Sequence, residues 1–133
     1  MNACVTDTHA LVWFVLDAPE LSADARQAML NAAANGEPVF MPSICLVELV
    51  YLIEKGRIPK ELLKRIKQTL ANPNSELTVY HLTEVVAESL ELVPRKDVPD
   101  MPDRIIAATA LHLGLPLVTR DGKIRAANIT TIW

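Results

Sequence analysis

Ala3-Cys4-Val5-Thr6-Asp7 lies at the start of the chain, and Leu117-Val118-Thr119-Arg120-Asp121 lies near its end. Each stretch is a short apolar run that ends in an aspartate and is followed by a pattern typical of a helix. Such runs indicate strands buried in a parallel sheet. Ligands of these sheets bind beyond the carboxyl ends of the strands, where the strand order reverses. We therefore expect Asp7 and Asp121 to converge at one edge of a sheet.

Strand-like and helix-like segments alternate along the whole chain, which indicates a parallel sheet covered on both faces. Strands are predicted over residues 2–6, 39–41, 77–82, 115–119 and 129–133. Helices are predicted over residues 8–16, 23–34, 44–55, 60–70, 84–92, 103–113 and 122–127. The prediction is a single α/β domain over residues 1–133, doubly wound in three layers, with a mainly parallel sheet of about five strands.

Helix boundaries are marked by capping residues. Ser22, Ser43 and Thr83 are predicted to cap the helices that follow them. Gly56 is predicted to end the helix that Ser43 caps, and Gly114 is predicted to end the helix over residues 103–113.

The composition indicates an ordered globular protein of the cytoplasm. Half of the 133 residues are apolar, the formal net charge is −3, and glycine is scarce. Cys4 and Cys45 lack the spacing of a disulfide or metal motif, so two buried thiols are expected. The longest uncharged run, residues 105–119, is interrupted by Gly114 and Pro116, so no membrane span is predicted.

Glu48 is the most informative acid, because its neighbours one helical turn away are largely apolar. A buried carboxylate without a partner costs several kcal/mol or takes up a proton. A buried ion pair would be the structural alternative to a metal site. For Asp7 and Asp121 the alternatives are a helix cap and an Asp-Gly turn, respectively.

Asp100 and Asp103 stand together at the start of a predicted helix. One of them can cap the helix while the other supports its dipole. Asp103 shares a face with the small residues Ala107 and Ala110, so the functional role is assigned to Asp103 and the cap to Asp100.

Four segments together resemble the PIN domain, and most of all the VapC-type toxins of bacterial toxin–antitoxin pairs. They are Val5-Thr6-Asp7-Thr8-His9-Ala10-Leu11-Val12-Trp13, Val47-Glu48-Leu49, Pro102-Asp103-Arg104-Ile105-Ile106-Ala107-Ala108-Thr109-Ala110, and Leu117-Val118-Thr119-Arg120-Asp121. They occur in order and span almost the whole chain. In many relatives proline directly follows the acid that corresponds to Asp100, whereas here Met101 intervenes.

The resemblance implies a Mg²⁺- or Mn²⁺-dependent endoribonuclease that forms a homodimer and is silenced by a cognate antitoxin protein. By position, the implied metal ligands and catalytic acids are Asp7, Glu48, Asp103 and Asp121, with Thr119 as a polar helper. Oxygen ligands of this kind suit hard divalent cations.

RNA needs cationic or polar contacts beside the acids. Thr8, Arg104 and Arg120 adjoin the acids, so we predict that they contact the substrate. Base stacking is not expected to dominate recognition, because aromatic residues make up only 5% of the chain. His9, next to Thr8, is assigned a packing role.

Two other functions compete with the nuclease. A haloacid-dehalogenase-like phosphatase would place a second aspartate where this chain has His9. A catalytically inactive PIN-like interaction module would have lost acids, whereas all four are present.

Overall fold

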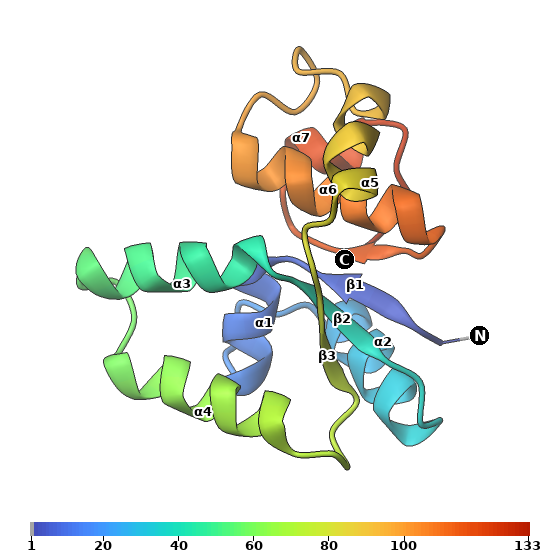
Figure 1. Ribbon diagram of the computed structural model, residues 1–133. Coiled ribbons are helices and arrows are strands. Elements are labelled where there is room, and N and C mark those ends of the chain that lie inside the picture. Colours follow the sequence, from blue (N-terminus) through green and yellow to red (C-terminus); the bar gives the residue numbers. More distant parts are fainter. Residues whose placement is uncertain (1) are drawn as a thin grey trace.

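The computed structural model describes residues 2–133, which build a five-stranded sheet in the order β3-β2-β1-β4-β5 (Figure 1). Every neighbouring pair of strands is parallel. The strands are β1 (Cys4–Thr6), β2 (Val39–Pro42), β3 (Leu77–Tyr80), β4 (Leu117–Val118) and β5 (Thr131–Ile132). The chain winds outward from β1 in one direction and then from β4 in the other. The predicted doubly wound α/β fold is confirmed, and the strand order reverses between β1 and β4.

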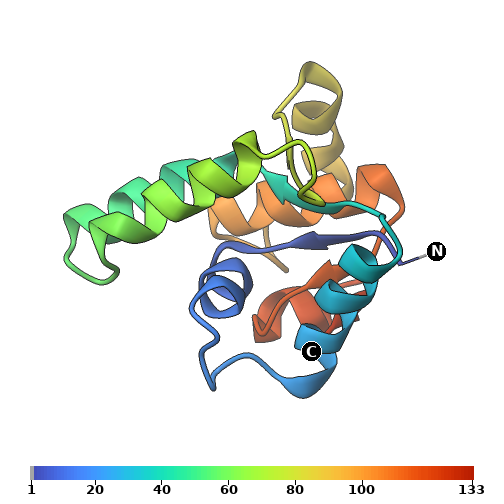
Figure 2. The ribbon, with the colours of Figure 1, turned by 90° about the horizontal axis from the view of Figure 1, so that it is seen from below.

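Helices cover both faces of the sheet (Figure 2). They are α1 (Thr8–Val15), α2 (Ala23–Ala34), α3 (Ile44–Glu54), α4 (Lys60–Ala71), α5 (Glu84–Glu88), the 3-10 helix η1 (Ser89–Leu92), α6 (Met101–Leu113) and α7 (Gly122–Ala126). Helix α2 packs against one face, and α4 and α6 contact the other. In the part of the chain that the structure describes, no helix combines the length and the apolar character needed to span a membrane.

The core is divided by the sheet, because successive side chains of a strand point to opposite faces. Cys4 and Val118 belong to the hydrophobic cluster beneath α2. Val5 and Leu117, their neighbours in sequence, belong to the larger cluster beneath α3, α4 and α6. Both cysteines are buried and unpaired, as predicted. Burial raises the pKa of the Cys4 thiol to about 11 and also raises the pKa of Cys45.

Several predicted boundaries shift by a few residues for identifiable reasons. Helix α6 begins at Met101 rather than Asp103, because the Asp100 carboxylate caps it and Pro102 is tolerated in the first turn. Strand β4 begins at Leu117 rather than Leu115. The Leu115 N–H is used to close α6 on the Ala110 carbonyl, and Pro116 has no N–H to offer a neighbouring strand.

Two of the three predicted capping residues behave as expected. The Ser22 and Thr83 side chains accept hydrogen bonds from the backbone N–H groups of Ala25 and Val86. Ser43 does not cap α3. Its hydroxyl instead accepts a hydrogen bond from the Leu82 N–H, which fastens the segment after β3 to the end of β2.

Candidate metal centre

Five carboxylates line one cavity of about 520 Å³ at the carboxyl edge of the sheet. The cavity lies beyond the ends of β1 and β4, where the strand order reverses. Its lining residues are Asp7, Thr8, His9, Trp13, Glu48, Asp100, Asp103, Arg120 and Asp121. The four acids selected from the sequence are therefore brought together, and Asp100 joins them.

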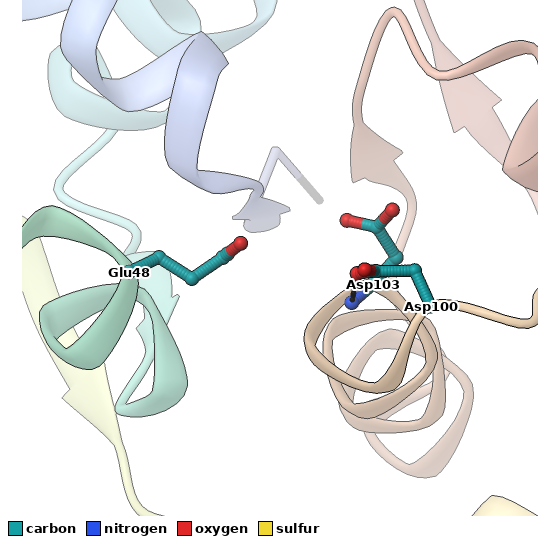
Figure 3. A group of neighbouring side chains, drawn as sticks. All are labelled: Glu48, Asp100 and Asp103. Atoms are coloured by element: carbon teal, nitrogen blue, oxygen red, sulfur yellow. Dashed lines mark hydrogen bonds between the residues drawn. The ribbon is translucent and has the colours of Figure 1, made fainter. Parts of the chain in front are cut away.

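Glu48, Asp100 and Asp103 form the tightest group (Figure 3). Glu48 reaches from α3 toward the first turn of α6, which carries both aspartates. One carboxylate oxygen from each of the three residues lies within 4.8 Å of the other two. This spacing allows one cation to contact all three side chains after small rotations.

Asp7 and Asp121 are placed by the helices that begin immediately after them. Asp7 Oδ1 accepts a hydrogen bond from the Ala10 N–H (2.8 Å), and Asp121 Oδ1 accepts hydrogen bonds from the N–H groups of Lys123 (2.8 Å) and Ile124 (3.1 Å). Asp7 thus caps α1, as its structural alternative held, and Asp121 caps α7, whereas its alternative was an Asp-Gly turn. Capping does not exclude a metal role, because the two cap bonds of Asp121 end on the same oxygen and both carboxylates still line the cavity.

Thr119 connects these two acids from beneath. Its side chain is buried, and its Oγ1 accepts a hydrogen bond from the Asp121 N–H (3.0 Å). Burial raises the pKa of Asp7, and the Thr119 side chain partly offsets this rise. This placement fits the polar supporting role that was expected for Thr119.

Thr8, which was predicted to contact the substrate, lines the cavity and also bonds to one of its acids. Its side chain is buried, and its hydroxyl donates a hydrogen bond of 2.5 Å to Glu48 Oε1. The half-buried Glu48 therefore has a neutral donor and not the basic partner of a buried ion pair. This hydrogen bond orients the Glu48 carboxylate.

The Arg104 side chain, which was also predicted to contact the substrate, bonds to two backbone carbonyls. Its Nε donates to the Val93 carbonyl (2.7 Å) and its NH2 group donates to the Leu90 carbonyl (2.9 Å). These carbonyls lie in and just after η1, and the Leu90 carbonyl also accepts a hydrogen bond from the Val93 N–H (3.0 Å). Arg104 holds this turn against α6 and is not part of the cavity wall among residues 2–133.

Burial and mutual repulsion disfavour the ionised form of the carboxyl groups in the cavity. Burial raises the pKa of Asp7 and of Glu48. For Asp103, burial together with the nearby Asp100, Asp121 and Glu48 raises the pKa to about 8. A divalent cation would relieve this repulsion, and the all-oxygen donor set fits a hard cation such as Mg²⁺ or Mn²⁺.

Residues 4–129 match the model of the PIN domain family. The chain belongs to this family. Ribonuclease VapC22 of Mycobacterium tuberculosis is 28% identical over 136 residues, with all of both chains covered.

Solved structures share the fold of this PIN domain. VapBC2 from Rickettsia felis, bound to a DNA fragment from its promoter, has a TM-score of 0.70 at 18% identity and covers 97% of this chain and 96% of its own. A toxin–antitoxin complex from Klebsiella pneumoniae has a TM-score of 0.65 at 20% identity, with 98% and 96% covered.

The prediction from sequence missed the contribution of three residues of this PIN domain to the cavity. Asp100 was assigned the cap, with a supporting role left open, yet its spacing of three residues from Asp103 places both on one helical face. His9 was assigned a packing role, but its side chain is exposed and lines the cavity. Trp13 lies one turn further along the same face of α1, a spacing that could have been read from the sequence.

Thr8→Val tests whether the Thr8 hydroxyl orients Glu48 for metal binding. Groups that orient a metal ligand typically contribute 10- to 100-fold to metal affinity. We expect Thr8→Val to weaken Mn²⁺ binding about 10-fold, as measured by titration calorimetry, and to leave the fold intact. Thr109→Val is the matched control, because the Thr109 side chain is also buried but bonds only to the Ile105 carbonyl within α6. Equal effects of the two substitutions would contradict the assigned role.

The raised pKa of Asp103 predicts a pH-dependent stability in EDTA. Between the ordinary carboxyl pKa of 3.8 and the value of about 8, folded protein holds more protons on Asp103 than unfolded protein does. The free energy of unfolding should therefore fall as the pH rises through this window. Urea unfolding from pH 5 to 8.5 should show this loss, and saturating Mn²⁺ should reverse it.

Asp103→Asn should flatten the same profile, because an amide cannot ionise. Asp24→Asn, which alters an exposed acid of α2, should keep the slope of the parent protein. A parent profile that is flat in EDTA would show that the acids do not repel one another as described.

Proposed function

We propose that this PIN domain is an endoribonuclease that hydrolyses RNA phosphodiester bonds with a bound Mg²⁺ or Mn²⁺ ion. The observation that carries the proposal is the convergence of Asp7, Glu48, Asp103 and Asp121 on one cavity, with Asp100 beside them. The similarity to a ribonuclease along the whole chain supports the same function. The haloacid-dehalogenase-like alternative is set aside, because the family match spans residues 4–129.

The proposed roles of the side chains follow from their positions. Glu48, Asp100 and Asp103 present oxygens from α3 and α6, while Asp7 and Asp121 present theirs from the ends of β1 and β4. When bound there, a divalent cation would lower the pKa of a water molecule and polarise the phosphodiester. Thr8 and Thr119 hold the acids in place. Arg120, which is exposed at the cavity wall, is proposed to contact the substrate.

The nuclease proposal predicts metal-dependent cleavage of RNA by the purified protein. Mg²⁺ or Mn²⁺ should support cleavage and EDTA should abolish it. Asp7→Asn and Glu48→Gln should each lower the initial rate at least about 100-fold, because a metal ligand matters more than the groups that merely orient it. Gel-based cleavage assays on single-stranded and structured RNA measure both effects.

Asp24→Asn serves again as the control and should retain the parent rate. Full activity of a folded Asp7→Asn variant would remove Asp7 from the catalytic set. A parent protein with no activity in either metal would favour the inactive interaction module.

We further propose that the protein is the toxin of a toxin–antitoxin pair, with residues 1–133 acting as one nuclease domain in the cytoplasm. The solved complexes that share its fold include toxin–antitoxin pairs. Val47, Val50 and Tyr51 on α3 leave apolar side chains 40–59% exposed, which suits contact with an antitoxin or with a second copy in a homodimer.

Expression in a bacterial host tests the toxin role. The parent protein should arrest growth, because unregulated RNA cleavage stops protein synthesis, whereas Asp7→Asn should not. Co-expression of a small DNA-binding protein encoded next to the gene should restore growth and co-purify with the toxin. Normal growth on strong expression of active nuclease would contradict the toxin role but not the chemistry.

A further inference from the structure

Arg120 occupies an unusual position for a cation in an acidic cavity. It shares the cavity wall with five carboxylates, yet it forms no ion pair within 4.0 Å among residues 2–133. Its guanidinium instead lies over the indole of Trp13, with the central carbon 4.6 Å from the ring centroid. The side chain is exposed, so the guanidinium is neither neutralised nor covered.

Trp13, on α1, positions the Arg120 guanidinium. Its ring lies 5.9 Å from that of Trp133 and packs against both hydrophobic clusters, so the indole is fixed within the fold. His9, one turn earlier on α1, lies 5.6 Å from the same indole and is exposed to the cavity. The result is a wall of three planar groups beside the acids.

Planar groups of this kind recognise unpaired nucleobases. Bases stack on aromatic rings and on the planes of arginine guanidinium groups, and stacking tolerates different base identities. A guanidinium stacked on tryptophan keeps its outer face and its N–H donors available. The guanidinium can therefore stack against a base or contact a phosphate while it stays on the indole.

The wall of planar groups lines one of two cavities that share acids. A second cavity of about 450 Å³ shares Asp100, Asp103 and Asp121 with the first. Its remaining lining residues include Lys123 but no aromatic side chain. A substrate that occupies both cavities would therefore meet planar groups in the first and the Lys123 amine in the second.

We propose that His9, Trp13 and Arg120 form a subsite for one unpaired nucleobase on a single side of the scissile phosphate. The base stacks on the Arg120 guanidinium beside the His9 imidazole, and Trp13 positions the arginine. The inference rests on the proposed ribonuclease function and adds to it a preference for single-stranded RNA.

The test uses binding, so that it does not depend on cleavage. Fluorescein-labelled single-stranded oligoribonucleotides carry one abasic ribonucleotide that is moved along the sequence. Affinity for the full-length protein is measured by anisotropy with Ca²⁺ in place of Mg²⁺. For the parent, one position or two adjacent positions should weaken binding about tenfold, the size expected for the loss of one stacked base.

Arg120→Lys keeps the charge but loses the planar group, and because the side chain is exposed the fold should be retained. Its affinity for intact RNA should fall about tenfold, and the sensitive position should disappear from its abasic profile. His9→Ala, which also changes an exposed side chain, should reduce the loss of affinity caused by the abasic nucleotide at the same RNA position. Arg57→Lys makes the same change at an exposed residue between α3 and α4, and it should reproduce the parent profile.

The outcomes separate this subsite from the nuclease function. A parent profile without a sensitive position, or one that survives in Arg120→Lys, would overturn the subsite even if the protein cuts RNA with Mg²⁺. A sensitive position that depends on Arg120 would support the subsite even if no RNA is cut. Absence of both RNA binding and cleavage would overturn both proposals.

Discussion

Repulsion between carboxylates gathered at one edge of the sheet is the constraint on which the rest of the site depends. Five of them line a single cavity, and burial together with these neighbouring acids raises the pKa of Asp103 to about 8. Such a cluster destabilises a fold unless a cation or protons offset it. The surrounding structure therefore has to hold the acids in place against their own repulsion.

The fold does so with neutral donors rather than with basic side chains. Backbone N–H groups of α1 and α7 bind Asp7 and Asp121, and the Thr8 hydroxyl binds Glu48. These donors orient the carboxylates and stabilise their charge without placing a competing cation among them. A lysine or arginine in the same place would pair with an acid and oppose the binding of metal. Among residues 2–133 no ion pair involves an acid of the cavity, which agrees with a site that can accept a cation.

Arg120 illustrates the same separation of charges. The indole of Trp13 provides an alternative partner for the guanidinium, so the one arginine of the cavity wall remains apart from the acids. By contrast, Arg104 directly follows an acid in sequence, but its guanidinium donates hydrogen bonds to the Leu90 and Val93 carbonyls. Both arginines are next to an acid in the sequence, but only Arg120 lines the cavity. Adjacency in sequence therefore did not predict which arginine lies beside the acids, because the side chains of adjacent residues can point to different surroundings.

The sequence by itself determined the alternation of strands and helices, the edge at which Asp7 and Asp121 meet, and the unusual position of Glu48. These features depend on periodicity, on capping and on the rule that parallel strands end at a common edge, all of which are local or topological. Only the tertiary structure decided that Asp100 joins Glu48 and Asp103, that Thr8 is buried against Glu48, and that Trp13 holds Arg120. Each of these contacts joins different elements of the fold, and its geometry depends on how the helices pack, which no single segment of the sequence specifies.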